Sequence, residues 1–473
     1  MPGSPSSIIA PYTETKAAIH SKLVSVDTVI LTRERANRSI SASHRGFFHW
    51  FDPSDGPVER RLILKLDFYI LTYACVGFWT LYIDRGILQN AYVSGMKEDL
   101  QLFGNQFVQL NAVFHIGYAT SMIPATLLIT KLPAQIVIPA AMALWAIFTL
   151  LSYRVSSFSE LAGYRFLVGF FEGPFFCSIH YVLGSWYRPD EIVRRSGIFY
   201  VSSGVGTMTT GLLAARIYKN LNGALGYAGW KWMYIVAASL TFPVAIWGFL
   251  TFPGTPSAGK RWNFTQEEFD LAIERMEACG RKEPQGIPFT FTSFKRFFGR
   301  WHWYILVPWN ILWIMGCMAS SQGALTLWLK SNKQYSTVEV NNYTAISPSL
   351  GIIWILAFSW LTDRFTIVLG TLEVSLSPLV YSWVNIICAG DAEERAFVIS
   401  SMLAVGTAFS AWVPLLAWQT VEAPRYFKGF VMSLVMQPIY FAWTVLVYCM
   451  VRMGRKHHTI RNQHHGAPQA SLF

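Results

Sequence analysis

Residues 158–183 read FSELAGYRFLVGFFEGPFFCSIHYVL, and this stretch decides the fold class of the chain. A helix needs about 20 apolar residues to cross the roughly 30 Å hydrocarbon core of a bilayer, and the stretch exceeds that length. Its ionisable side chains include Arg165, Glu172 and His180, which stand among aliphatic and aromatic residues. Charged groups are costly against lipid, so we expect a transmembrane helix that turns these side chains towards a protein interior.

Comparable apolar stretches recur along the whole chain. Of its 473 residues, 53% are hydrophobic and only 14% are charged, against about 25% charged residues in soluble domains. Most of the stretches have the length of membrane spans. They predict an all-α polytopic membrane protein with about eleven spans, at 66–86, 107–130, 134–153, 158–183, 197–218, 232–252, 304–329, 343–361, 367–388, 396–418 and 427–451.

The polar segments between the spans divide the chain into parts. The N-terminal segment is Ser-rich and lacks the apolar stretch of a secretory signal, so we expect a disordered cytoplasmic tail. In the long polar segment after the sixth span, Thr265 and Glu268 have the spacing of a capping box, which predicts an amphipathic helix at the membrane surface. The parts are the tail 1–60, an N-terminal six-helix bundle 61–252, a cytoplasmic linker 253–300, a C-terminal bundle of about five spans 301–451, and a basic tail 452–473.

The span count conflicts with the charge of the C-terminal tail. An odd number of spans places the tail outside, yet residues 452–473 carry basic residues and no acid, which favours the cytoplasmic side. Either the tail departs from this rule or a span is missing. Residues 362–366 form a short joint that leads directly into an atypical segment with Glu373 and Pro378. We therefore infer that the third span of the second half is absent.

Composition and motifs exclude several classes of function. The net charge of +11 lies in tails and loops, where attraction to the anionic cytoplasmic leaflet explains it without nucleic acid. The six cysteines are scattered, have no metal-ligand spacing, and are expected to be reduced. Residues 254–261 approach a phosphate-binding loop, but Pro256 removes a backbone donor and Arg261 replaces the hydroxyl that holds magnesium. We therefore expect no metal, no cofactor and no enzymatic activity.

Two pairs of charged residues form the candidate site. Arg165 and Glu172 are seven residues apart, about two helical turns, so they project from nearly the same face. Glu172 is the candidate proton carrier, because a poorly solvated carboxyl group can change charge near neutral pH. Arg165 is a second proton-coupling candidate, or a structural partner that fixes helix packing. Arg85 offers a permanently charged fork to a substrate carboxylate, with Asp84 as its resting counter-ion, although a charge at a span end commonly reaches lipid headgroups.

Other polar and aromatic residues are weaker candidates. His180 is either a hydrogen-bonded core histidine or a residue that binds substrate or relays protons. Trp328 and Asn385 are candidates for lining the substrate cavity. The tryptophans around the seventh predicted span are interpreted as an aromatic belt at the membrane interface, namely Trp301, Trp303, Trp309 and Trp313.

Several motifs resemble those of one transporter family. They are residues 82–85 (YIDR), 90–100 (NAYVSGMKEDL), 165–173 (RFLVGFFEG), 180–187 (HYVLGSWY), 300–303 (RWHW), 327–329 (LWL), 382–388 (SWVNIIC) and 394–396 (ERA). The set resembles the fungal anion:cation symporter family, which is the allantoate permease group of the major facilitator superfamily, and within it the pantothenate transporters. The resemblance covers about residues 60–450, except for the missing span.

The resemblance implies an architecture and roles for particular residues. It implies two six-helix bundles around a substrate site near the membrane midplane. It implies that Arg85 engages the substrate, and His180 matches a histidine of related carboxylate symporters. Asp363 and Arg364 resemble a loop motif of the superfamily that holds one conformation of the transport cycle, for which a plain solvated turn is the alternative.

These observations predict a secondary active transporter that carries a small organic anion, pantothenate or a similar carboxylate, together with protons. We expect a multi-pass monomer in the plasma membrane. An inside-negative potential opposes anion entry by about 2.3 kcal/mol per 100 mV, so cotransported protons are needed. Two alternatives remain: transport of another organic acid or secondary metabolite, and a non-transporting relative that acts as a sensor.

Overall fold

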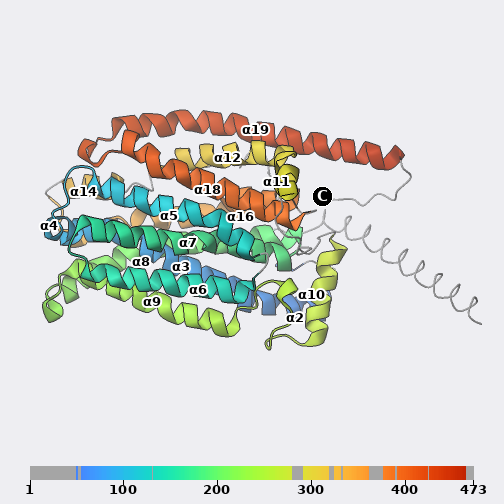
Figure 1. Ribbon diagram of the computed structural model, residues 1–473, viewed down its shortest axis with the longest axis horizontal. Coiled ribbons are helices and arrows are strands. Elements are labelled where there is room, and N and C mark those ends of the chain that lie inside the picture. Colours follow the sequence, from blue (N-terminus) through green and yellow to red (C-terminus); the bar gives the residue numbers. More distant parts are fainter. Residues whose placement is uncertain are drawn as a thin grey trace, which may run out of the picture. The chain divides into compact units, whose positions relative to one another are not determined.

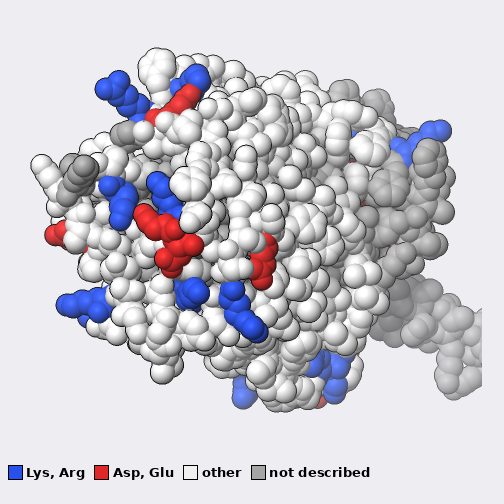
Figure 2. Space-filling view, turned by 60° about the vertical axis from the view of Figure 1, so that its left-hand side comes forward, with Lys and Arg blue, Asp and Glu red and all other residues white. Residues whose placement is uncertain are grey.

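The structure is a computed structural model, and it describes residues 50–51, 55–129, 132–279, 291–318, 324–331, 334–361, 377–388, 391–423 and 425–464. These residues are almost entirely helical and include no β-strand, which confirms the all-α prediction. Seven helical stretches among them are long and apolar enough to cross a membrane: Pro57–Asp99, Ala134–Arg154, Phe158–Trp186, Glu191–Leu221, Gly229–Thr251, Glu393–Ala417 and Phe427–Met453. Figure 2 shows charged side chains gathered on one end face, while much of the visible flank is uncharged.

The first half is built from long helices with short connections (Figure 1). Its first crossing is a continuous series that includes two π-helical turns: α2 (Pro57–Leu66), η2 (Asp67–Leu71), α3 (Thr72–Ala91), η3 (Tyr92–Met96) and α4 (Lys97–Asp99). The helices that follow are α5 (Gln106–Ile129), α6 (Ala134–Leu151) with η4 (Ser152–Arg154), α7 (Phe158–Trp186), α8 (Pro189–Leu221), and α9 (Gly229–Thr251), which is preceded by η5 (Ala224–Gly226). These helices fall on the six predicted spans of this half.

The linker carries helices of its own, η6 (Pro256–Ala258), α10 (Gln266–Ala278) and α11 (Phe291–Phe298). The capping box at the start of α10 is confirmed: the Thr265 hydroxyl accepts from the Glu268 backbone N–H at 3.2 Å, and the Glu268 carboxylate accepts from the Thr265 backbone N–H at 2.9 Å. Lys65 of α2 adds an ion pair to Glu268 at 2.6 Å. These contacts hold α10 against the first bundle.

The second half contains shorter helices. They are α12 (Trp301–Gly316), α14 (Ala324–Ser331), α15 (Thr337–Tyr343), α16 (Ile346–Leu361), α17 (Ser377–Ile387), α18 (Ala392–Ala417), η8 (Thr420–Glu422) and α19 (Phe427–His464). The range 304–329, predicted as one span, therefore holds parts of two helices, because α12 ends at Gly316. In Figure 1, α12, α18 and α19 lie side by side.

Hydrogen bonds show the direction of the last helix. The Ser433 hydroxyl of α19 contacts the carbonyl of Met315 at 3.5 Å, and the Trp443 indole of α19 donates to the carbonyl of Ile305 at 2.9 Å. The helix therefore runs antiparallel to α12. As it nears Arg452 it approaches the start of α12, at the end of the bundle next to the linker, which we call the linker end. Arg452, the first residue of the basic tail, therefore lies towards the same end of the bundle as the basic linker, as the charge rule favours.

The chain also returns to the linker end around α17. Helix α16 runs antiparallel to α8, since Gly211 of α8 adjoins Ala345, just before α16, while Gly204, nearer the start of α8, adjoins Ile352 of α16. Leu361 thus lies towards the linker end, where α18 also begins. The predicted span 367–388 is represented among the described residues by α17 alone, whose 11 residues cover about 16 Å, half a bilayer. Among the described residues α17 is the only helix between Leu361 and Asp391, and the total of about eleven spans stays a prediction. Asp363 and Arg364, the gating candidates, lie outside the described residues.

Glycines allow α5 and α7 to approach each other closely. A Cβ atom on Gly169 would stand 2.2 Å from the carbonyl oxygen of Phe114, and one on Gly117 would stand 2.3 Å from that of Phe166. Backbone contact at this distance excludes any side chain, so the two helices are fixed in register. This register places Tyr118 of α5 opposite Glu172 and Gly173 of α7.

Candidate substrate and proton site in the first bundle

Arg85 and Glu172 form an ion pair between α3 and α7. The Arg85 Nε donates to the Glu172 Oε1. The Glu172 side chain is fully buried, whereas 26% of the Arg85 side chain is exposed. The structure thus brings together the two residues that the sequence selected separately. A buried carboxylate with a single guanidinium partner, open on one side, can exchange that partner for another anion.

Aromatic rings hold the guanidinium of Arg85. Its Cζ lies 4.6 Å from the ring centre of Tyr118 and 5.3 Å from that of Tyr82. A cation above an aromatic face is stabilised by the ring quadrupole by about 0.5–2 kcal/mol. Sequence reasoning missed Tyr118. In the sequence it resembles the other tyrosines of the apolar stretches, and only the packing of α5 against α7 brings it to Arg85.

Asp84 is not the counter-ion of Arg85, and that expectation is wrong. Its Oδ2 accepts from the Trp145 indole of α6 at 2.9 Å and from the Thr241 hydroxyl of α9 at 3.3 Å. Consecutive residues of a helix point about 100° apart, so the buried Asp84 faces the inside of the bundle while Arg85 faces Glu172. Asp84 thereby joins α3, α6 and α9.

Arg165 is buried one aromatic ring away from the ion pair. Its Cζ lies 4.4 Å from the ring centre of Phe114, and the Arg85 Cζ lies 5.7 Å from the same ring. Among the described residues Arg165 forms no ion pair with Glu172. The guanidinium groups of Arg85 and Arg165 therefore flank the ring of Phe114, and their combined positive charge attracts an anion.

His180 lies deeper on α7 and is completely buried. The rings of Phe176, Phe199 and Tyr381 surround it, at centroid distances of 4.4, 5.5 and 5.4 Å. Within the described part of the chain neither ring nitrogen has a hydrogen-bond partner. Tyr381 belongs to α17, so a residue of the second half takes part in burying His180.

Asn385 lies where α17 meets α7. Its amide donates to the carbonyl of Tyr381 at 3.0 Å, and a Cβ atom added to Gly184 would stand 2.5 Å from its Oδ1. Arg395 of α18 reaches the same place and donates to the carbonyl of Gly184 at 3.4 Å. Asn385 therefore stands at the contact between the two halves, near the linker end.

Two of the tryptophans singled out in the sequence lie in different surroundings. Trp328 is 47% exposed on α14, and its expected place in the cavity lining stays a prediction. Trp309 is buried and donates to the Thr444 hydroxyl of α19 at 2.9 Å. It belongs to the core and not to an interface belt, because the face of α12 that carries it packs against α19.

The halves also touch at the end opposite the linker. The Asn341 amide of α15 donates to the Ser94 hydroxyl at 3.2 Å, and the Gln89 amide donates to the Thr326 hydroxyl. Together with the contact at Gly184, these bonds join the two halves at both ends of their interface.

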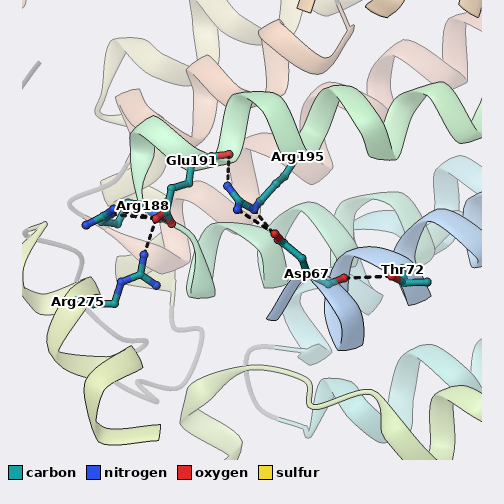
Figure 3. Close-up of polar contacts among 6 residues, drawn as sticks. All are labelled: Asp67, Thr72, Arg188, Glu191, Arg195 and Arg275. Carbon is teal, nitrogen blue, oxygen red and sulfur yellow. Dashed lines mark hydrogen bonds and ion pairs between the residues drawn. The ribbon is translucent and has the colours of Figure 1, made fainter. Parts of the chain in front are cut away.

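A separate ionic cluster ties the start of α8 to its surroundings at the linker end. Arg195 binds Asp67 through two bonds, 2.6 Å from Nε and 3.0 Å from Nη2. Glu191 accepts from Arg275 of α10 at 2.5 Å and pairs with Arg188 at 3.0 Å. Figure 3 shows Glu191 and Arg195 near the start of α8, facing Arg275 and Asp67. This cluster fixes the linker to the first bundle and leaves the substrate site untouched.

Comparison with known proteins gives a consistent picture. The family model of the Major Facilitator Superfamily matches residues 74–447. The Vitamin H transporter of Saccharomyces cerevisiae is 32% identical over 450 residues, covering 85% of this chain and 74% of that protein. The pantothenate transporter liz1 of Schizosaccharomyces pombe is 30% identical, covering 86% of this chain and 85% of that protein. The xylose transporter XylE from E. coli, in a partially occluded inward-open conformation, has the same fold with a TM-score of 0.53 and 13% identity, covering 80% of this chain and 98% of that chain.

Proposed function

The chain belongs to the Major Facilitator Superfamily of membrane transporters, and on that basis we propose that it is a proton-coupled symporter of a small organic monocarboxylate. Pantothenate is the first candidate substrate and the plasma membrane the proposed location. The relatives named for pantothenate and vitamin H support this class of substrate, since both vitamins are monocarboxylic acids. We further propose that the chain acts as a monomer and is not an enzyme.

The observation that carries the proposal is the buried ion pair of Arg85 and Glu172. A substrate carboxylate has the same chemistry as the side chain of Glu172, so the two compete for the guanidinium of Arg85. An ionised carboxylate left without a partner in a buried site is very costly, and such a group takes up a proton instead. Substrate binding at Arg85 therefore requires one proton at Glu172.

This exchange couples the anion to the proton gradient. One anion and one proton enter together without net charge, so the membrane potential of about 2.3 kcal/mol per 100 mV no longer opposes uptake. When the halves part towards the linker end, loss of the proton restores the ion pair and expels the substrate. Arg165 and Asp84 are the other charged groups near Glu172. In this scheme Arg165 stays on the ring of Phe114, and Asp84 keeps its hydrogen bonds to α6 and α9.

The test is uptake of labelled pantothenate by a yeast that lacks its own pantothenate transporter. Wild-type protein is expected to accumulate the label, and more strongly at external pH 5 than at pH 7. Glu172→Gln is expected to lose accumulation by about tenfold or more, because a permanently neutral residue cannot release its proton inside. Glu160→Gln, on the same helix outside the ion pair, is the matched control. Undiminished accumulation that still follows pH in Glu172→Gln would remove Glu172 from the scheme.

A further inference from the structure

His180 is a buried polar residue that the ion pair does not explain. Its imidazole is fully enclosed, and in the described part of the chain neither ring nitrogen is hydrogen-bonded. Buried polar groups in proteins are nearly always paired, since an unpaired one costs about 1–3 kcal/mol. An enclosed and unpaired imidazole therefore indicates a place for a polar group that is not part of the chain.

The surroundings of His180 define the shape of that group. Phe176 of α7, Phe199 of α8 and Tyr381 of α17 place their rings 4.4–5.5 Å from the imidazole centre. No charged residue pairs with His180 among the described residues, and the Tyr381 hydroxyl donates to Asn310 at 2.8 Å. Such surroundings exclude a second carboxylate, because a buried charge needs a charged or multiply hydrogen-bonding partner. They fit a neutral polar group that carries alkyl carbons.

The distance from the ion pair sets the length of the ligand. His180 follows Glu172 by eight residues on an unbroken helix, which is about 12 Å along the helix axis. Phe176 stands halfway, and its ring contacts both Phe78 of α3 and His180. The side chains packed between the two polar points are therefore aromatic and apolar.

We propose that the ring-enclosed His180 binds the neutral, hydroxyl-bearing end of the substrate whose carboxylate is held by Arg85. This inference rests on the proposed function and narrows its substrate class. The substrate is a monocarboxylate with an uncharged hydrogen-bonding group about 10 Å from the carboxylate. Pantothenate has eight bonds between its carboxyl carbon and its terminal hydroxyl oxygen, which is about 10 Å at roughly 1.2 Å per bond.

The chemistry of the imidazole agrees with a hydroxyl partner. A neutral imidazole offers one N–H donor and one acceptor nitrogen, and a hydroxyl group both donates and accepts. One or two hydroxyls can therefore satisfy both ring nitrogens. Tyr381 comes from the second half, so movement of α17 away from α7 opens the cage, and return of Tyr381 encloses the bound end.

The experiment compares pantothenate with an analogue of the same length in which both hydroxyls are replaced by hydrogen. Each unlabelled compound competes with labelled pantothenate for uptake by cells that carry the wild type, His180→Gln or His180→Phe. The wild type is expected to prefer pantothenate by about tenfold or more, the value of one lost hydrogen bond to a buried group. His180→Gln keeps a donor and an acceptor and retains most of this preference. His180→Phe binds the two compounds within about twofold.

Two further measurements keep the test decisive. Phe170→Leu, on the exposed face of the same helix, is the control and is expected to behave like the wild type. His180→Cys covers the case in which the phenylalanine variant does not reach the membrane: its thiol should react more slowly with a methanethiosulfonate reagent when pantothenate is present, and equal rates would contradict the proposal.

The outcomes separate this inference from the proposed function. An unchanged preference in His180→Phe, with normal uptake of pantothenate, overturns the role of His180 and leaves the proposed function standing. The histidine is then a core residue paired with water. A wild type that takes up no pantothenate overturns the proposed function, and the inference falls with it.

Discussion

The two halves of the molecule differ in the length of their helices and in the charge of their buried side chains. The first half consists of long helices, and it buries the charged side chains of Glu172, Asp84 and Arg165, with Arg85 partly exposed beside Glu172. The second half has the short α17, and α19 leaves most of its apolar side chains exposed, among them Phe427, Leu434 and Phe441. Its buried polar groups are mainly neutral, such as Asn310, which accepts from Tyr381 at 2.8 Å. On the proposed function, the difference teaches that the charges assigned to the anion and the proton come from one half, while the other half packs over them.

The first prediction tests this difference between the halves by removing one arginine from each. Arg85→Ala is expected to lower pantothenate uptake by about a hundredfold or more, because it deletes the group that binds the carboxylate and leaves Glu172 unpaired. Arg395→Ala removes a contact to a backbone carbonyl of Gly184 and is expected to cost at most about tenfold. Initial rates of uptake, corrected for the amount of protein in the membrane, measure both. Equal losses would show that the halves share the anion site.

The second prediction concerns the ionic cluster of the first half. Asp67→Asn breaks the two-bond pair with the buried Arg195 and is expected to cost about 3–5 kcal/mol of stability. Glu422→Gln in the second half breaks an exposed pair with Lys428 and should cost less than about 1 kcal/mol. Thermal unfolding of the detergent-solubilised protein compares the two variants. A larger loss for Glu422→Gln than for Asp67→Asn would contradict the assignment.

Sequence reasoning predicted the helices of the first half well and the partners of their side chains poorly. The apolar stretches located α5 to α9, and the capping box at Thr265 located α10, because both signals are local. The pairing of Arg85 with Glu172 instead of Asp84 depends on the rotation of α3 about its axis, which hydropathy does not encode. The same holds for Trp309, whose burial is decided by the packing of α12 on α19.

The second half was predicted less well for a different reason. Trp328 was placed inside a span because residues 304–329 form one apolar stretch, and the end of α12 at Gly316 has no strong sequence signal. Charge counts alone do not decide how many times the chain crosses the membrane between Leu361 and Asp391.

The third prediction tests the helix contact that fixes the site. Gly169→Ala places a Cβ 2.2 Å from the carbonyl oxygen of Phe114 and is expected to cost about 1–3 kcal/mol by forcing α5 and α7 apart. Gly163→Ala on the same helix meets no atom within 4 Å and is expected to be stabilising by about 0.5–1 kcal/mol. Size-exclusion profiles after a heat step report both effects. Equal behaviour of the two variants would show that the close approach is not needed.

The smallest effect is expected at the linker. Thr265→Ala removes the hydroxyl that caps α10 and is expected to cost about 1 kcal/mol without changing uptake. Partial burial raises the pKa of Glu268, but the hydrogen bonds from Lys65 and Thr265 outweigh it and leave that pKa below its ordinary value. A lowered pKa means that the contact stabilises α10 above about pH 4 and is lost as the pH falls further. Limited proteolysis of the linker at pH 7 and pH 3.5 measures this, and a pH-independent cleavage rate would contradict it.

The most direct test of the exchange between substrate and Glu172 is a count of protons. Purified protein in a weakly buffered detergent solution is mixed with pantothenate, and the proton uptake is measured with a pH indicator. The account predicts close to one proton taken up per pantothenate bound by the wild type and none by Glu172→Gln. Binding without proton uptake in the wild type, or the same uptake in Glu172→Gln, would contradict it.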